Sequence, residues 1–176
     1  MRLSRVFAGL SMFVLVATCA FASSGRRQIR ATLKGFNEVP AKFTAGQGTF
    51  RATIDQTART ITFTLTFSGL SGAPLASHIH FAQKDVNGGV QVFFCDGTGH
   101  PACPAGTSGT ITGTITPADV IATVPDQGIE NGEFDKLVQA ILAGKTYVNI
   151  HTAQFPGGEI RGQITADDDE DENDDH

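Results

Sequence analysis

The chain has 176 residues, and its 13 Lys and Arg against 18 Asp and Glu give a formal net charge of −5. Eight of the acidic residues lie in the last ten positions, so residues 23–166 carry 11 basic and 10 acidic side chains. A nearly neutral body gives no electrostatic case for nucleic acid binding. Roughly 150 residues are enough for one domain with a single core.

The first 22 residues have the three parts of an export signal. Arg2 and Arg5 precede an apolar run at 6–16, and Ala-Phe-Ala at 20–22 provides a small-residue cleavage site. A membrane helix needs about 20 apolar residues, so this run is too short to span a bilayer. We expect cleavage after residue 22, no transmembrane helix in the mature chain, and export to the periplasm or out of the cell. The alternative is a lipoprotein signal in which Cys19 is acylated.

The chain from residue 29 onward, after a short linker at 23–28, predicts an all-β domain. Short runs rich in Thr, Val, Ile and Phe alternate with clusters of Gly, Pro, Asn and Asp. In the clearest run, 60–67, threonines alternate with Ile, Phe, Leu and Phe, which gives one polar and one apolar face. We expect an antiparallel, Greek-key-like β-sandwich or barrel of about eight strands, at 29–33, 48–54, 60–67, 77–81, 90–94, 109–115, 147–152 and 159–164.

One segment, 133–143, departs from the strand period of two. Its apolar residues fall on a helical stripe, and Gly144 follows as a stop signal. We therefore predict one helix packed against the sheet. The last segment, 167–176, has no apolar residue and is expected to be disordered. The folded domain is accordingly assigned to 29–166.

Cys95 and Cys103 are the two cysteines that remain after the predicted cleavage. An even number of cysteines in an exported chain favours a disulfide, and Gly, Pro and polar residues separate these two. The alternative is a pair of metal thiolates, but their spacing is not typical of a zinc site.

Three histidines lie in predicted strands, opposite the apolar faces of those strands. His78 and His80 are two residues apart within 77–81, so both imidazoles lie on one face. His151 lies within 147–152, on the face opposite the apolar residues of that strand. If the strands are neighbours in the sheet, the three imidazoles converge on one polar patch.

Three imidazoles with an open coordination position suit copper or zinc, which accept nitrogen ligands. Glu159 and Arg161, the outward residues of 159–164, are predicted to lie beside these ligands. The alternative is that the histidines are surface residues or hydrogen-bonded structural residues, because His-x-His also occurs on strands by chance.

Four segments carry a family resemblance. They are Leu-Lys-Gly-Phe-Asn-Glu-Val-Pro at 33–40, Ser-His-Ile-His-Phe at 77–81, Gly-Glu-Phe-Asp-Lys-Leu at 132–137, and 147–164, which begins Tyr-Val-Asn-Ile-His-Thr and ends Glu-Ile-Arg-Gly-Gln-Ile. Together they resemble the CHRD domain, which is named for chordin and is found in many exported bacterial proteins. The resemblance implies an exported domain without an assigned activity. The chain lacks the cystine-rich modules of chordin, so growth-factor binding is not implied.

A second resemblance is to copper/zinc superoxide dismutase, a β-barrel with His-x-His on one strand. It implies that His78, His80 and His151 match copper ligands and that Arg161 matches an anion-guiding arginine. The set of zinc-binding and bridging histidines of those enzymes has no counterpart between Phe81 and Gly109. Dismutation is therefore not implied.

These features favour an exported, non-catalytic module of the cell envelope or extracellular space that binds an unidentified protein or envelope component. The sequence has no Gly-x-Ser-x-Gly elbow and no phosphate-binding glycine loop, and we predict no catalytic residues. The alternative is a copper- or zinc-binding β-sandwich whose three-histidine site is redox-active.

Overall fold

The computed structural model describes residues 25–96 and 100–167. The predicted signal peptide at 1–22, the alternative acylation site Cys19 and the acidic segment after residue 167 lie outside the described residues. Within the described ranges, no helix is long and apolar enough to cross a membrane.

The eight predicted strands and the predicted helix all form, with bounds that differ by a few residues. A ninth strand of two residues was not predicted. The strands are β1 (Arg26–Lys34), β2 (Gln47–Asp55), β3 (Thr60–Ser68), β4 (Pro74–Phe81), β5 (Gly89–Cys95), β6 (Gly109–Ile115), β7 (Thr146–Thr152), β8 (Ile160–Gln163) and β9 (Thr165–Ala166). The helices are α1 (Phe134–Leu142) and the short 3-10 turns η1 (Gly35–Asn37), η2 (Pro117–Asp119) and η3 (Pro125–Gln127).

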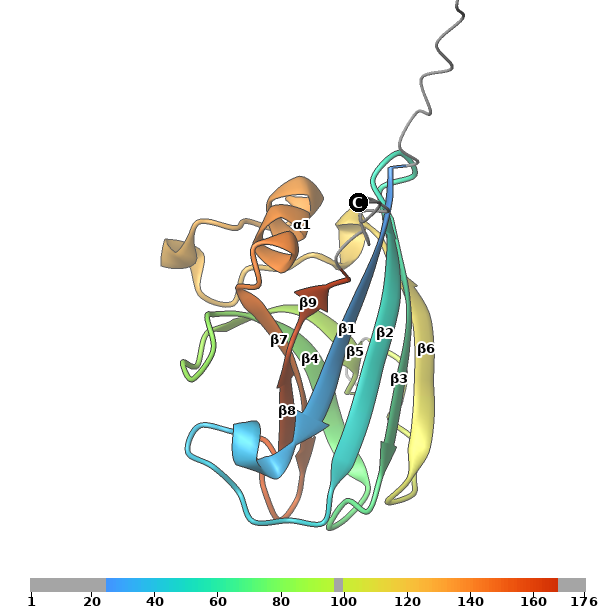
Figure 1. Ribbon diagram of the computed structural model, residues 1–176, viewed down its shortest axis with the longest axis vertical. Coiled ribbons are helices and arrows are strands. Elements are labelled where there is room, and N and C mark those ends of the chain that lie inside the picture. Colours follow the sequence, from blue (N-terminus) through green and yellow to red (C-terminus); the bar gives the residue numbers. More distant parts are fainter. Residues whose placement is uncertain (1–24, 97–99, 168–176) are drawn as a thin grey trace, which may run out of the picture.

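All these strands belong to one sheet, in the order β5-β4-β7-β8-β1-β2-β3-β6, with β9 paired to β1. The pairs are antiparallel, and β3–β6, β4–β7 and β8–β1 join strands that are not consecutive, as Greek-key-like topology requires. The sheet curls until its end strands β5 and β6 lie against each other (Figure 1). Of the two predicted architectures, sandwich and barrel, the structure is a nearly closed barrel.

The barrel interior is filled by the apolar residues of the alternating strands. In β3, Ile61, Phe63, Leu65 and Phe67 are buried, while the threonines between them face outward. The Phe94 ring contacts both Phe63 and Phe50, with centroids 4.4 Å and 5.6 Å apart. Helix α1 lies over one end of the barrel (Figure 1) and buries its apolar face, Phe134, Leu137, Val138, Ala140 and Ile141.

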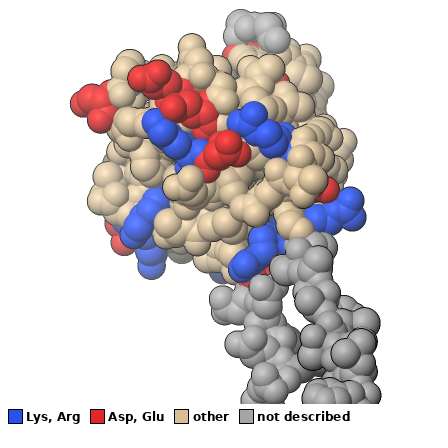
Figure 2. Space-filling model, turned by 90° about the horizontal axis from the view of Figure 1, so that it is seen from above, with Lys and Arg blue, Asp and Glu red and all other residues tan. Residues whose placement is uncertain are grey.

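Figure 2 shows the end of the molecule that carries α1, where acidic and basic side chains are interspersed. Two of the ion pairs in this region are Lys136 with Glu133 at 2.7 Å and Arg59 with Asp135 at 3.2 Å. Exposed pairs of this kind contribute about 0–1 kcal/mol each. Apolar burial under α1 is therefore the main source of stability at this end.

Strands β4, β7 and β8 differ from β1, β2, β3 and β6 because they are buried on both faces over much of their length. The segment 82–88 folds back over the outer face of β7 and β8. Arg161 of β8 donates hydrogen bonds to the Val86 carbonyl at 2.7 Å and to Asn87 Oδ1 at 3.1 Å. Gln163 donates to the Ala82 carbonyl at 3.0 Å. Polar side chains on this part of the outer face are consequently enclosed.

The predicted disulfide is confirmed: Cys95, at the end of β5, is bonded to Cys103 in the connection to β6. We expect Cys95→Ala/Cys103→Ala to lower the free energy of unfolding by about 2.5 kcal/mol, because a bridge between residues eight apart restricts the unfolded chain. Urea unfolding of the variant and of the wild type, each with and without reductant, measures this. The prediction fails if reductant destabilises the double variant as much as the wild type.

Candidate metal centre

The pairing of β4 with β7 brings the three predicted histidines together. Asn149 lies opposite His78 and Tyr147 lies opposite His80 in the register of these two strands. His151 is two residues beyond Asn149, so its side chain is on the same outer face. The register of β4 against β5 shifts after Ser77 and after Ile79. Irregularities of this kind re-aim side chains and are common beside functional sites.

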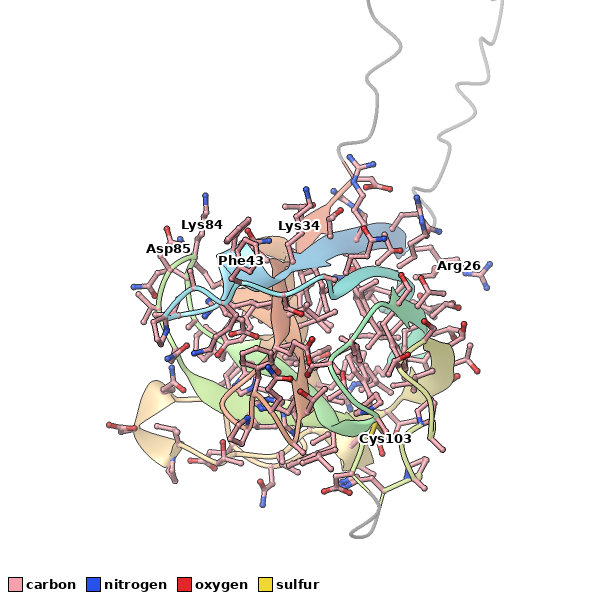
Figure 3. All side chains as sticks on the ribbon, turned by 90° about the horizontal axis from the view of Figure 1, so that it is seen from below. Arg26, Lys34, Phe43, Lys84, Asp85 and Cys103 are labelled. Carbon is pink, nitrogen blue, oxygen red and sulfur yellow. A yellow bond between two sulfur atoms is a disulfide. The ribbon has the colours of Figure 1, made fainter. Side chains whose placement is uncertain are left out.

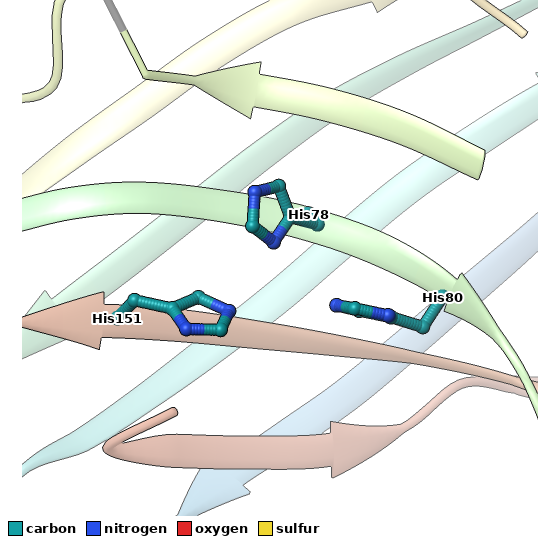
Figure 4. Close-up of side chains that lie close together, drawn as sticks. All are labelled: His78, His80 and His151. Carbon is teal, nitrogen blue, oxygen red and sulfur yellow. The ribbon is translucent and has the colours of Figure 1, made fainter. Parts of the chain in front are cut away.

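The rings of His78, His80 and His151 form a compact group, which we call the histidine cluster. One ring nitrogen from each residue lies within 4.8 Å of the others. Figure 4 shows a nitrogen of each ring directed toward the space between the rings. In a tetrahedral site with metal–nitrogen bonds of about 2.0–2.1 Å, neighbouring nitrogens are about 3.3 Å apart. Side-chain movements of about 1 Å would therefore bring all three within bonding distance of one ion.

Backbone carbonyls fix the orientation of two of the rings. Nδ1 of His80 is 2.9 Å from the Gly88 carbonyl oxygen, and Nδ1 of His151 is 2.9 Å from the Pro156 carbonyl oxygen. A carbonyl can only accept, so each Nδ1 carries the hydrogen and each Nε2 keeps its lone pair. This is the arrangement of metal-binding histidines, whose second nitrogen donates to a carbonyl or carboxylate.

Two nitrogens of the histidine cluster are buried and unpaired. Within the part of the chain that the structure describes, His78 Nδ1 and His151 Nε2 have no hydrogen-bond partner. A buried polar atom without a partner destabilises a fold by about 1–3 kcal/mol, so such atoms are uncommon and call for an explanation. A bound metal ion would satisfy both.

Burial also keeps the cluster neutral. It lowers the pKa of His78 to about 3, and the nearby His151 and His80 lower it further, while a hydrogen bond with Asn149 acts in the opposite direction. Burial lowers the pKa of His80 to about 4 and lowers the pKa of His151 as well. Imidazoles must be neutral to bind a metal, so the three rings are in the ligand form at neutral pH.

Arg161, predicted to lie beside the ligands, reaches them only through an aromatic ring. Its guanidinium carbon is 3.4 Å from the Tyr147 ring centroid, and the His80 ring stacks on Tyr147 at 4.6 Å with an angle of 2° between planes. Arg161 and His80 come from strands on either side of β7, so Tyr147 lies between them. The buried guanidinium thus clamps the tyrosine, and the tyrosine supports one face of His80.

Glu159 lies in a separate polar cluster. Its carboxylate accepts hydrogen bonds from Thr44 Oγ1, Ser71 Oγ and Thr152 Oγ1, all at 2.6 Å, and from the Ser71 amide at 2.8 Å. Burial raises the pKa of Glu159, but these hydrogen bonds outweigh it and lower the pKa overall. Because Thr152 follows His151, Glu159 anchors the end of the strand that carries this histidine.

Two residues outside the predicted site, Tyr147 and Asn149, line the histidine cluster directly. Asn149 Oδ1 is 3.1 Å from His80 Nε2. Tyr147 is four residues and Asn149 two residues before His151 on β7, and this spacing was the available signal, because strand side chains two residues apart share a face. His100 lies outside the cluster: it stacks on Phe93 at 4.6 Å and contacts Asp96 at 3.0 Å.

Glu38 is a second buried ionisable group near Arg161. It is 5% exposed, and among the described residues its Oε1 has no hydrogen-bond partner. Burial raises the pKa of Glu38 to about 7, although the charge of Arg161 opposes the shift. Gly158 lies against this carboxylate with φ of 120°, where a side chain would be both strained and in collision. This close packing of Gly158 against the carboxyl group of Glu38 excludes water from it.

The stability of the metal-free protein should fall as the pH is lowered from 6.5 to 4. In this window the unfolded histidines take up protons, while His78 and His80 in the folded state, with pKa values of about 3 and about 4, do not. Each proton bound only by the unfolded chain lowers the free energy of unfolding by about 1.4 kcal/mol per pH unit.

Glu38 has the opposite effect on the pH dependence of stability, because its pKa of about 7 in the folded protein exceeds the ordinary value of 4.5. Glu38→Gln should therefore make the loss of stability on acidification steeper, and His80→Phe should make it shallower. Urea unfolding between pH 7.5 and pH 5.0 in the presence of a chelator measures both slopes. A Glu38→Gln variant whose free energy of unfolding does not change over this pH range would contradict the prediction.

Comparison with known families agrees with the sequence resemblance. The family model of the CHRD domain matches residues 29–164, which is most of the chain and contains β1 to β8 from Ile29 onward together with the histidine cluster. No curated protein and no solved structure matches the chain. The extent of the family match is sufficient to assign the protein: it belongs to the CHRD family.

Proposed function

We propose that this CHRD-family protein is exported and binds one copper or zinc ion through His78, His80 and His151. The observation that carries the proposal is the convergence of three neutral imidazoles whose ligand nitrogens lie within 4.8 Å of one another. The orientation of two rings by backbone carbonyls supports it, because it leaves Nε2 of each ring free to bind.

The chemistry of the donors limits the choice of metal. Imidazole nitrogen suits zinc and copper, whereas magnesium and calcium prefer oxygen ligands. Three histidine ligands leave the fourth position of a tetrahedral site to a further ligand.

Export is the compartment that fits the rest of the molecule. The N-terminal segment has the composition of a signal peptide. The Cys95–Cys103 disulfide is of the kind that persists in the periplasm and outside the cell, where thiols are not kept reduced. An exported site would meet copper or zinc under oxidising conditions.

Metal titration tests the proposed function. We expect the refolded, tag-free protein to bind one equivalent of Zn²⁺ or of Cu⁺ under anaerobic conditions, and His80→Ala to weaken binding at least 100-fold. Tyr147 is the only tyrosine and the chain has no tryptophan, so intrinsic fluorescence reports from a ring stacked on His80. Cu²⁺ should quench this emission at one equivalent.

His100→Ala is the matched control, since it removes an imidazole outside the histidine cluster, and it should bind metal as the wild type does. Circular dichroism of each variant establishes that it is folded. Stoichiometric binding that survives His80→Ala, or no binding above background in the wild type, would refute the metal site.

A second candidate function, a module that docks to the cell envelope, is favoured by two exposed aromatic residues. Phe36 is 69% exposed and Phe43 is 90% exposed, and their rings contact each other edge to face at 6.0 Å. Both belong to the connection between β1 and β2, and Figure 3 shows Phe43 at the end of the barrel that also bears Lys34. An exposed aromatic pair beside a cation suits attachment to an anionic envelope component.

The docking candidate predicts that Phe36→Ser/Phe43→Ser reduces co-sedimentation with envelope fragments of the producing cells several-fold without loss of stability. Leu75→Ser is the control, because Leu75 is another exposed apolar residue, at 54%. Equal sedimentation of the wild type and the double variant would exclude this surface as the docking site.

A further inference from the structure

Asn149 occupies the middle of the histidine cluster. It lies opposite His78 in the pairing of β4 with β7 and is 3% exposed. Its backbone carbonyl accepts a hydrogen bond from Ser77 Oγ at 2.8 Å, which ties it to β4. Its side chain contacts a histidine of β4: the carboxamide oxygen is 3.1 Å from His80 Nε2.

The two atoms that meet between Asn149 and His80 are both hydrogen-bond acceptors, and neither carries a hydrogen. Nδ1 of His80 must carry a hydrogen because it faces the Gly88 carbonyl oxygen. His80 is buried, and a neutral imidazole carries only one ring hydrogen. Nε2 therefore presents a lone pair to the carboxamide oxygen, which also presents lone pairs.

A cation between the two atoms would turn this repulsion into a pair of bonds. Ligand atoms of a tetrahedral site with bonds of about 2.0–2.1 Å are about 3.3 Å apart. The 3.1 Å between His80 Nε2 and Asn149 Oδ1 is close to that separation. The oxygen thus stands where a fourth ligand would stand, on the same face as the three imidazoles.

We propose that the carboxamide oxygen of Asn149 is the fourth ligand of the site and makes it selective for Zn²⁺ and Cu²⁺ over Cu⁺. This inference rests on the proposed metal-binding function. A carbonyl-type oxygen is a hard ligand that binds divalent ions better than the soft Cu⁺ ion. In the metal-free protein, rotation of the carboxamide by half a turn lets its NH₂ group donate a hydrogen bond to His80 Nε2. The same side chain therefore provides a partner for His80 when no ion is bound.

The test compares Zn²⁺ and Cu⁺ affinities of the wild type, Asn149→Leu and Asn149→Asp, measured by competition with chromophoric chelators. Leucine has a similar size and no oxygen, so Asn149→Leu should weaken Zn²⁺ binding about 10- to 100-fold, while Cu⁺ binding changes less than about 3-fold. Asn149→Asp adds a negative charge at the ligand atom and should tighten Zn²⁺ binding at least 10-fold.

A second readout separates a ligand from a merely structural residue. Co²⁺ in place of Zn²⁺ should give a visible absorption spectrum that differs between the wild type and Asn149→Leu, because one ligand of the ion has changed. Asn131→Leu is the matched control: Asn131 accepts a hydrogen bond from the Ala122 amide, outside the histidine cluster, and its loss should alter neither affinity nor spectrum.

The outcomes are distinct. If the wild type binds neither ion, the proposed function and this inference both fail. If the wild type binds Zn²⁺ but Asn149→Leu binds it equally or more tightly, the three-histidine site stands and the fourth-ligand inference is overturned. If Asn149→Leu does not fold, an unchanged Zn²⁺ affinity in Asn149→Asp overturns the inference by itself.

Discussion

The antiparallel hydrogen bonding between β4 and β7 is the constraint on which the candidate site depends. These strands are far apart in the sequence, and their register sets Asn149 against His78 and Tyr147 against His80. A shift of one residue would turn every side chain of one strand to the opposite face and separate the imidazoles. The register is fixed from inside the barrel, where Ile79 and Val148 are opposite each other and fully buried. Apolar packing on one face of the sheet thus positions the polar cluster on the other.

Enclosure of the cluster is the second requirement, and Arg161 supplies much of it. Its guanidinium holds the segment 82–88 over β8 and lies on the Tyr147 ring, which in turn supports His80. The same segment provides the Gly88 carbonyl that orients His80. Burial lowers the pKa of His78, His80 and His151, and among the described residues it leaves two ring nitrogens of the cluster without a hydrogen-bond partner. This arrangement is unfavourable for imidazoles without a bound ion, but it suits three imidazoles that coordinate one metal ion together.

The two residues predicted to flank the ligands show where a strand pattern stops being informative. Arg161 lies within β8 and faces outward, as the alternation of 159–164 indicates, but Tyr147 stands between it and His80. Glu159 precedes the first residue of β8, so the alternation of that strand does not govern it. Its side chain instead joins Thr44, Ser71 and Thr152, three residues that the sequence does not connect. The periodicity of a single strand cannot predict hydrogen bonds to residues from other segments of the chain.

The sequence by itself determined the local features: the strand segments, the face on which each histidine lies, the helix α1 and the pairing of Cys95 with Cys103. These follow from side-chain periodicity, helix stop signals and cysteine count, which depend on residues close together in the chain. Only the tertiary structure decided that β4 neighbours β7, that one curled sheet forms rather than two packed sheets, and that Asn149 stands among the histidines. Strand order and loop cover arise from contacts between distant segments, whose free energy depends on the packing of the whole barrel and not on any local pattern.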